Sequence, residues 1–136
     1  MEQFAEYNHA IASLALWGLW MIALSLLSTR GRTPKDRAEC GKPKRDYSNE
    51  AYRRERAFQN AIETSPGFLA TTLAAILAGG APLAVNIFAS LFLLSRLIMA
   101  YVHIQTENQP MRSLFFGIGW LCIIGLALTA LVAVFF

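Results

Sequence analysis

Long apolar segments separated by short polar ones dominate this chain of 136 residues. Four of the apolar segments are each long enough for a membrane span of about 20 residues. They cover residues 10–27, 57–78, 83–104 and 113–136. Helices of a soluble core would carry polar residues on every turn, whereas the last segment carries only Cys122 and Thr129 after Ser113. The pattern therefore predicts an all-α integral membrane protein, folded as a bundle of four transmembrane helices.

Turn and capping residues indicate where these helices end. Asn108 is a suitable N-cap, and Pro110 suits the first turn of the helix that follows. The Gly-Gly-Ala-Pro sequence at residues 79–82 predicts a short turn between antiparallel helices. Pro66 would kink the second helix, which a spanning helix tolerates where its neighbours satisfy the freed carbonyl. We expect one membrane domain over residues 1–136. Its helices are expected at about residues 8–28, 50–78, 83–105 and 109–136.

Basic residues are concentrated in the polar loop at residues 29–52 and just after it. Of the 12 Lys and Arg residues, ten lie between positions 30 and 56. Such a bias in a short loop sets membrane topology, so we expect a cytoplasmic loop with both termini on the other side. The net charge of +3 then reflects topology and attraction to membrane lipid headgroups. Nucleic acid is not an expected partner, because few aromatic residues interleave with these charges. Cys40 and Cys122 lack metal-ligand spacing, so no metal site is expected.

A polar stripe runs along the second helix. At about 100° per residue its members fall within roughly 80° of one another. They are Arg53, Arg56, Asn60, Glu63 and Gly67. The other faces of this helix past Arg56 carry mainly Ala, Phe, Ile, Leu and Thr. A carboxylate two turns into such an apolar helix needs a partner, and the stripe supplies basic ones. We therefore expect Glu63 to have a basic partner.

Charged residues of three helices are expected to meet at the end of the bundle nearest the basic loop. Arg96 lies near this end of the third helix, with Met99 and His103 on its face, and Arg112 and Ser113 begin the fourth helix. Ionisable groups at membrane depth cost several kcal/mol unless they are paired or hydrated, so they mark function by default. One cavity is expected to be lined by Arg56, Asn60, Glu63, Arg96 and Arg112.

Each of these residues also has a plainer interpretation. Arg96 and Glu63 could form a structural ion pair that holds the bundle together. Arg112 could extend to the lipid headgroups, and Arg53 could belong to the topology signal. An interfacial histidine such as His103 is usually hydrated and has no catalytic part, so a general-base role for it is not favoured.

An arginine-rich cavity with one carboxylate suits a zwitterionic ligand of net negative charge. Arginines bind the carboxylates of such a ligand as bidentate pairs, and Glu63 would bind its ammonium group. Arg112 lies in the first turn of a helix, where backbone N–H groups and the positive end of the helix dipole favour an anion. A guanidinium there would stabilise a thiolate and lower the pKa of a thiol from about 8.5 towards neutrality. A bound thiol would thus become a nucleophile without a dedicated base.

The spacing of these residues resembles the MAPEG family, the membrane-associated proteins in eicosanoid and glutathione metabolism. The matching residues are Arg56-Ala57-x-x-Asn60-x-x-Glu63, Pro66, Arg96 and Arg112-Ser113. The resemblance covers nearly the whole chain. Within the family, the chain most resembles the branch of microsomal glutathione transferases and prostaglandin E synthases. We expect it to be a bacterial member of that branch.

The resemblance implies a homotrimer that binds glutathione, as cosubstrate, between subunits on the cytoplasmic side of a bacterial inner membrane. Arginines of the family hold the glutathione carboxylates, and the glutamate of the second helix holds its amino group. Arg112 matches the arginine that stabilises the thiolate, Ser113 matches the serine beside it, and Arg30 matches an arginine from the neighbouring subunit. The residues expected to bind glutathione are Arg53, Arg56, Asn60, Glu63, Arg96, His103 and Arg30.

Two departures from the family pattern lie on the third helix. His103 stands where a tyrosine is usual, and Met99 stands where His or Tyr is frequent. The leading hypothesis is a membrane-bound glutathione transferase, with peroxidase activity as an extension, that acts on lipophilic electrophiles in the bilayer. The departures favour the alternative of a non-catalytic lipid-binding scaffold with the same fold. A small proton-coupled cation exporter is disfavoured, because the basic loop and the arginines would repel its substrate.

Overall fold

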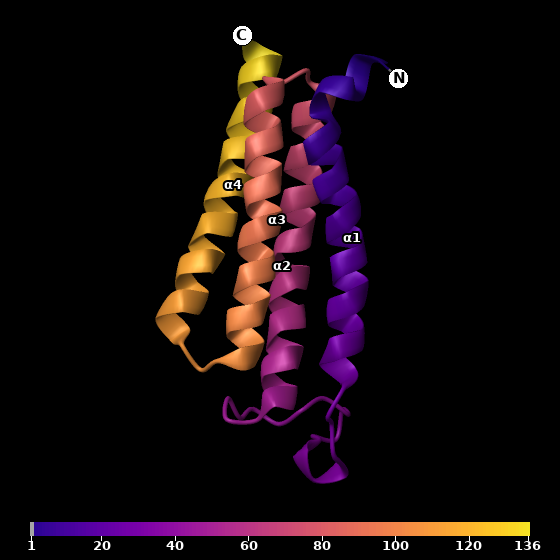
Figure 1. Ribbon diagram of the computed structural model, residues 1–136, viewed down its shortest axis with the longest axis vertical. Helices are drawn as coiled ribbons and strands as arrows, with labels where there is room; N and C mark the ends of the chain where they lie inside the picture. Colours follow the sequence, from indigo (N-terminus) through magenta and orange to yellow (C-terminus); the bar gives the residue numbers. More distant parts are fainter. Residues whose placement is uncertain (1) are drawn as a thin grey trace.

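The computed structural model describes residues 2–136, and within them the chain forms a bundle of four long α-helices (Figure 1). They are α1 (Asn8–Thr29), α2 (Glu50–Leu77), α3 (Pro82–Gln105) and α4 (Gln109–Phe135). A short 3-10 helix, η1 (Glu2–Tyr7), leads into α1, and a second one, η2 (Pro34–Asp36), lies in the basic loop. The expected all-α class is confirmed, and each long helix begins and ends within one residue of its expected position.

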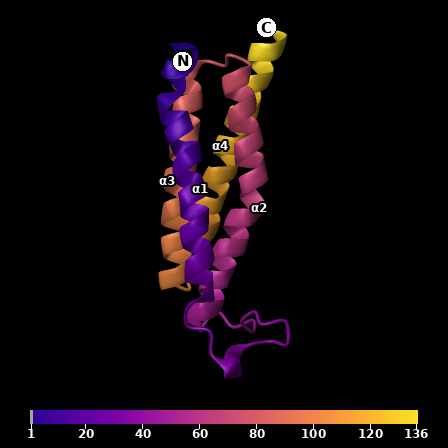
Figure 2. The same ribbon diagram turned by 90° about the vertical axis from the view of Figure 1, so that its right-hand side faces the viewer.

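Apolar composition distinguishes three of the long helices in the described chain from the fourth. The segment Phe4–Thr29, α3 and α4 are each long and apolar enough to cross a membrane. The helix α2 has 28 residues but carries Arg, Glu, Asn and Gln in its first half. It lies beside the others in both views (Figures 1 and 2) and contacts all three of them. Its polar residues therefore belong to a helix that packs against all three of the other long helices.

Aromatic side chains fill the middle of the bundle. Phe68 of α2 stacks on Phe92 of α3, with ring centroids 3.9 Å apart. Trp17 of α1 packs edge-on against Phe92 at 5.1 Å, and its indole nitrogen donates a hydrogen bond of 2.9 Å to the Ser65 hydroxyl. All three rings are fully buried or nearly so. This apolar layer separates the end of the bundle that carries both termini from the end that carries the basic loop (Figure 1).

The basic loop at residues 30–49 extends beyond the bundle next to the start of α2 (Figure 2). Its middle folds back on itself, with an isolated antiparallel bridge between Arg37 and Pro43. Gly41 closes that turn with a φ of +80°, a conformation that favours glycine. Asn49 ends the loop and caps α2, because its side chain accepts a hydrogen bond from the N–H of Ala51.

Candidate functional site

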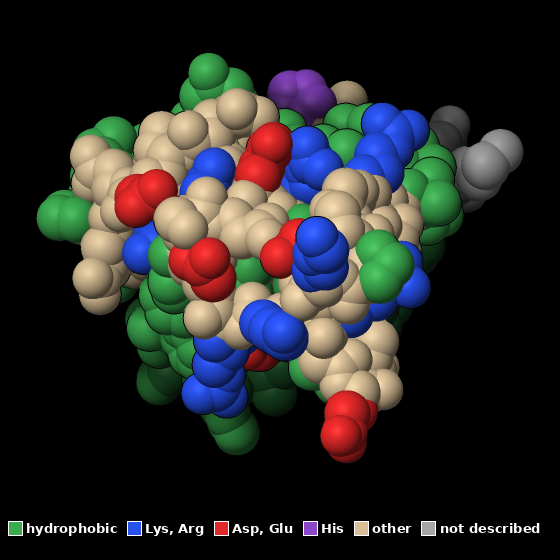
Figure 3. Space-filling model, turned by 90° about the horizontal axis from the view of Figure 1, so that it is seen from below, with side chains coloured by type: hydrophobic (Ala, Val, Ile, Leu, Met, Phe, Trp, Pro, Cys, Tyr) green, Lys and Arg blue, Asp and Glu red, His purple; other side chains and the backbone are tan. Residues whose placement is uncertain are grey.

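The end of the bundle that carries the basic loop also carries the expected site residues. Seen from that end, Lys and Arg side chains alternate with Asp and Glu, while hydrophobic side chains cover the flanks (Figure 3). Apolar flanks suit a lipid environment, and a charged end suits the boundary between membrane and water. Among residues 2–136, no group of three or more His, Cys, Asp and Glu side chains is arranged to hold a metal ion.

Arg96 is the most deeply buried of the expected site residues, with 3% of its surface exposed. Its Nη2 donates to the backbone carbonyl of Asn60 on α2, at 3.0 Å, and to the Asn60 side-chain oxygen. Its Nη1 lies 2.8 Å from the sulfur of Met99. The guanidinium also lies over the ring of Phe116 at 5.6 Å. Gly119 of α4 leaves the space for this side chain, because an added Cβ would lie 3.1 Å from Arg96 Cδ.

His103 lies seven residues after Arg96 on α3, nearer the loop, and is also buried, with 5% of its surface exposed. Its ring stacks on Tyr47 of the loop, with centroids 6.2 Å apart and planes inclined by 15°. Neither ring nitrogen has a hydrogen-bond partner in the described part of the chain. The interpretation of His103 as a hydrated interfacial residue is therefore wrong, because packing removes it from water. The positive charges that act on it come from Arg112, Arg56, Arg96 and Arg53.

Arg112, at the start of α4, lies over the same tyrosine. Its guanidinium carbon is 4.6 Å from the centre of the Tyr47 ring. Its Nη1 is buried and has no hydrogen-bond partner within residues 2–136. The guanidinium thus lies against the protein instead of extending towards lipid headgroups. Ser113, its neighbour on α4, is exposed.

Arg53 differs from Arg112 in that its guanidinium donates hydrogen bonds to backbone carbonyls of the same chain. Its Nε donates to the carbonyl of Ile104 at 2.8 Å. Its Nη1 donates to the carbonyls of Tyr47 and Ser48, at 2.6 and 3.0 Å. Arg53 therefore joins the end of α3 and the basic loop to the start of α2.

Glu63 does not have the expected basic partner. It is exposed, and no ion pair reaches it from any residue that the structure describes. Its charge acts on Arg96, which is in the same region of the bundle. The expectation of a pair within one chain is wrong because α2 turns Asn60 towards Arg96 and leaves Glu63 on the outer surface of the bundle.

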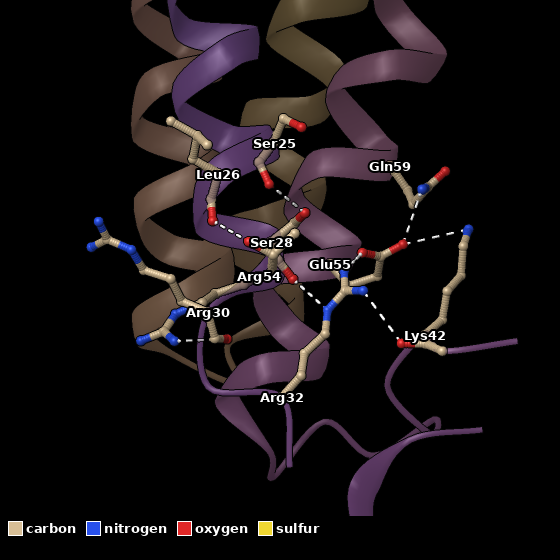
Figure 4. Close-up of polar contacts among 11 residues, drawn as sticks. Ser25, Leu26, Ser28, Arg30, Arg32, Lys42, Arg54, Glu55 and Gln59 are labelled. Carbon is tan, nitrogen blue, oxygen red and sulfur yellow. Dashed lines mark hydrogen bonds and ion pairs between the residues drawn. The ribbon is translucent and has the colours of Figure 1, made fainter. Parts of the chain in front are cut away.

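Glu55 is a buried, paired carboxylate at this end of the bundle (Figure 4). The helical spacing of polar residues along α2 did not indicate a role for it. Arg32 Nη2 lies 2.6 Å from one of its oxygens, and Lys42 Nζ lies 3.5 Å from the other. Gln59 donates a further hydrogen bond of 3.1 Å. Arg32 also donates to the carbonyl of Ser28 at 2.8 Å, so one guanidinium joins α1, the loop and α2. Arg30 is exposed close by, and its carbonyl accepts a hydrogen bond from Arg54.

Two hollows of different size lie at this end. A cavity of about 10 Å³, room for about one water molecule, is lined by Asn60, Arg96, Met99 and His103 among others. An open groove of about 530 Å³ lies outside it, within the usual size range of small-molecule sites. Its polar lining includes Lys42, Lys44, Arg45, Arg56 and Gln59. Of the expected lining residues, Asn60 and Arg96 line the cavity and Arg56 lines the groove, whereas Glu63 and Arg112 line neither. The part of the chain that the structure describes therefore does not form the single shared cavity that was expected.

Comparison with known proteins identifies one family. The model of the MAPEG family matches residues 10–132, which is nearly the whole chain. No curated protein matches the chain.

Proposed function

The chain belongs to the MAPEG family, and we propose that it is a membrane-bound transferase that activates glutathione for attack on lipophilic electrophiles. Membership of this membrane family and three apolar helices make the chain an integral membrane protein in contact with lipid. An electrophile that partitions into the bilayer would reach the apolar flanks of the bundle directly. The polar end beside the loop would bind the water-soluble thiol.

One observation carries this proposal: buried polar nitrogens without partners gather at the polar end. They are Arg96 Nε, Arg112 Nη1 and the two ring nitrogens of His103, as far as the described residues extend. Leaving such groups unsatisfied is costly, so each calls for a physical explanation. A ligand with two carboxylates and one amino group supplies the acceptors that the arginines lack. Glutathione has this set of groups together with the thiol that the reaction needs.

The roles of the residues follow from their chemistry. Arg112 would stabilise the thiolate after the thiol gives its proton to solvent, and Ser113 would donate a hydrogen bond beside it. The thiolate sulfur then forms a bond to the electrophilic carbon, and the displaced electron pair leaves with the departing group. With a lipid hydroperoxide the sulfur would attack oxygen instead, the O–O bond would break and the alkoxide would leave as the alcohol after taking up a proton. A second glutathione would then attack the sulfenic acid that remains, which releases water and forms the disulfide. The residues proposed to hold glutathione are Arg53, Arg56, Asn60, Glu63, Arg96, His103 and Arg30.

We propose that the working form is a homotrimer with the site between subunits. Glu63 is exposed, and the apolar side chains of Ile62, Leu69 and Leu73 on the same helix are exposed as well. An ionised carboxylate facing lipid costs several kcal/mol, so a neighbouring protein surface is a better environment for it. Arg30 is exposed at the loop end and could enter the site of a neighbour. This arrangement would also enlarge the small cavity of one chain.

The thiolate step is tested by ultraviolet absorbance of purified protein in detergent or nanodiscs. Glutathione added to the wild-type protein should produce the thiolate absorbance at neutral pH, and Arg112→Ala should abolish it. Arg37→Ala is the matched control, because it removes one exposed arginine of the loop and should leave the absorbance unchanged. A wild-type protein that never ionises the thiol would contradict the proposal.

The alternative function is a lipid-binding scaffold without catalysis, and one contact favours it. Both terminal nitrogens of Arg96 already contact neighbours, Asn60 and Met99, so this arginine has a structural explanation. Titration calorimetry separates the two functions. A scaffold would show no heat of binding with millimolar glutathione, whereas a transferase would bind it.

A further inference from the structure

We propose that Tyr47, in the basic loop, is a positioning residue that holds Arg112 and His103 in place at the site. The inference rests on the proposed function, because it concerns the arginine that would stabilise the thiolate. No motif pointed to Tyr47, which lies outside the apolar helices. Its importance comes from what the fold gathers around one aromatic ring.

Residues from three helices meet at Tyr47. Arg112 of α4 lies over the ring, 4.6 Å from its centre. His103 of α3 stacks against it with planes only 15° apart. Arg53 of α2 donates a hydrogen bond of 2.6 Å to its backbone carbonyl. One loop residue thus touches a candidate site residue on each of these helices.

Tyr47 is itself held in place. Tyr52, in the first turn of α2, packs edge-on against its ring with centroids 5.1 Å apart. On the other side, the Asp46 carboxylate accepts hydrogen bonds from the backbone N–H and the hydroxyl of Ser48, at 2.9 and 2.7 Å. The Asn49 N–H donates to the Asp46 carbonyl at 3.1 Å. The turn that presents Tyr47 is therefore ordered before α2 begins.

Arg112 depends on this ring for its position. The contact with Tyr47 is the one polar or aromatic interaction of its guanidinium among residues 2–136. A long flexible side chain without that contact samples several rotamers, and its charge is then less well placed to stabilise a thiolate. The face of the ring supplies the attraction, because the Tyr47 hydroxyl makes no hydrogen bond in the described chain. Tyr47→Phe should therefore preserve the function of this residue.

The test compares Tyr47→Ala and Tyr47→Phe with the wild-type protein and with Tyr101→Ala, which removes an exposed tyrosine of α3. The first readout is the pH titration of bound glutathione by thiolate absorbance. Tyr47→Ala should lower the thiolate fraction at neutral pH about threefold, the loss expected for one partly exposed cation–π contact. Tyr47→Phe and Tyr101→Ala should titrate as the wild type does.

The second readout needs no glutathione. Phenylglyoxal modifies accessible arginines, and peptide mass spectrometry measures its rate at Arg112. That rate should rise about threefold in Tyr47→Ala and stay at the wild-type value in Tyr47→Phe. If Tyr47→Ala does not fold, Tyr47→Leu replaces it, since leucine fills the space without an aromatic face and should show the same two changes.

The two readouts separate two failures. Unchanged modification of Arg112 in Tyr47→Ala, or an unchanged titration, overturns the positioning role of Tyr47 while the transferase proposal stands. A faster modification in a protein that never forms a thiolate, even as wild type, overturns the transferase proposal. The faster modification would still support Tyr47 as the residue that holds Arg112 in place.

Discussion

Arg96 can lie in the interior of an apolar bundle because its neighbours replace water. Asn60 contributes two oxygens, Met99 a polarisable sulfur and Phe116 the face of its ring. Only Nε is left without a partner in the described chain. A bound carboxylate would therefore meet the Nε hydrogen and the second Nη1 hydrogen of Arg96, and would gain more only by displacing Asn60 or Met99. At the level of single residues, Arg112 and His103 are the freer groups, which makes them better candidates for ligand contact.

The turn that presents Tyr47 should depend on pH through Asp46. The side-chain hydrogen bond from Ser48, then its backbone N–H, and the charge of Arg53 hold the pKa of Asp46 below its usual value of 3.8. A carboxyl with a lowered pKa in the folded state stabilises the protein above its unfolded pKa, and this stabilisation is lost as pH falls through the folded value. Asp46→Asn should thus unfold at a lower temperature than wild type at neutral pH. The difference should vanish in strong acid.

The matched control for this prediction is Asp36→Asn, which changes a carboxylate elsewhere in the same loop. Thermal unfolding followed by circular dichroism at several pH values measures both variants. A difference between Asp46→Asn and wild type that persists unchanged at a pH well below the lowered folded pKa of Asp46 would contradict the linkage, because both proteins then carry a neutral side chain at this position.

At the level of elements, Arg32 is expected to hold the basic loop against the bundle. It joins the end of α1, the turn at Gly41 and the buried carboxylate of Glu55 on α2. Arg32→Ala would leave Glu55 with Lys42 as its cation, and the Lys42 side chain is exposed and its Nζ lies 3.5 Å from the carboxylate. The expected loss is about 1–3 kcal/mol of unfolding free energy, the cost of a buried charged group that loses its hydrogen bond. Denaturation in detergent measures it.

A double mutant separates this pair from general damage to the loop. Glu55→Gln removes the charge that Arg32 compensates, so adding it to Arg32→Ala should restore part of the lost stability. Arg37→Ala, an exposed arginine five residues along, should cost little. If the two losses of stability simply add, Arg32 and Glu55 do not stabilise each other, and the pair does not hold the loop against the bundle.

The helices can be predicted from the sequence because their signals are local. Apolar runs define their lengths, and Asn108 caps α4 as expected, accepting a hydrogen bond of 3.1 Å from the Met111 N–H. The partner of Glu55 cannot be predicted in this way. Arg32 lies 23 residues away across a loop without periodicity, so no helical spacing links the two. Helical spacing likewise gives no sign of Tyr47, whose contacts depend on where the loop folds back.

The candidate site is predictable only in part for the same reason. Periodicity and span direction place Asn60 and Arg96 at one end of the bundle, and the structure shows them in direct contact. Periodicity does not say which neighbour each side of α2 faces. Glu63 shares a stripe with Asn60 but lies on the outer surface. The difference between these two residues is decided by how the whole bundle packs, and beyond that by what packs against the bundle.

At the level of the whole molecule, the proposed trimer can be tested by complementation between subunits. Arg30 and Glu63 are both exposed in one chain, at different places on its surface. If one subunit contributes Arg30 and its neighbour Glu63 to the same site, then Arg30→Ala and Glu63→Ala should each weaken glutathione binding. Subunits carrying one change each, coexpressed and mixed at random, would form about a quarter of their sites from two intact residues. Calorimetry should therefore find about a quarter of the wild-type binding capacity at full affinity.

Three controls make this result specific. Homotrimers of each variant should show no sites of wild-type affinity, and native mass spectrometry should show that the mixed preparation contains trimers of both subunit types. A single chain carrying both changes, mixed with wild type in equal amounts, should leave a quarter of the sites intact if the two residues come from different subunits, and half of them intact if both come from the same chain. If the coexpressed single variants recover no wild-type sites although mixed trimers form, Arg30 and Glu63 do not meet across a subunit boundary. Glutathione would then have to bind between subunits through other residues, or within one chain, where the groove beside Arg56 is large enough and the cavity beside Arg96 is not.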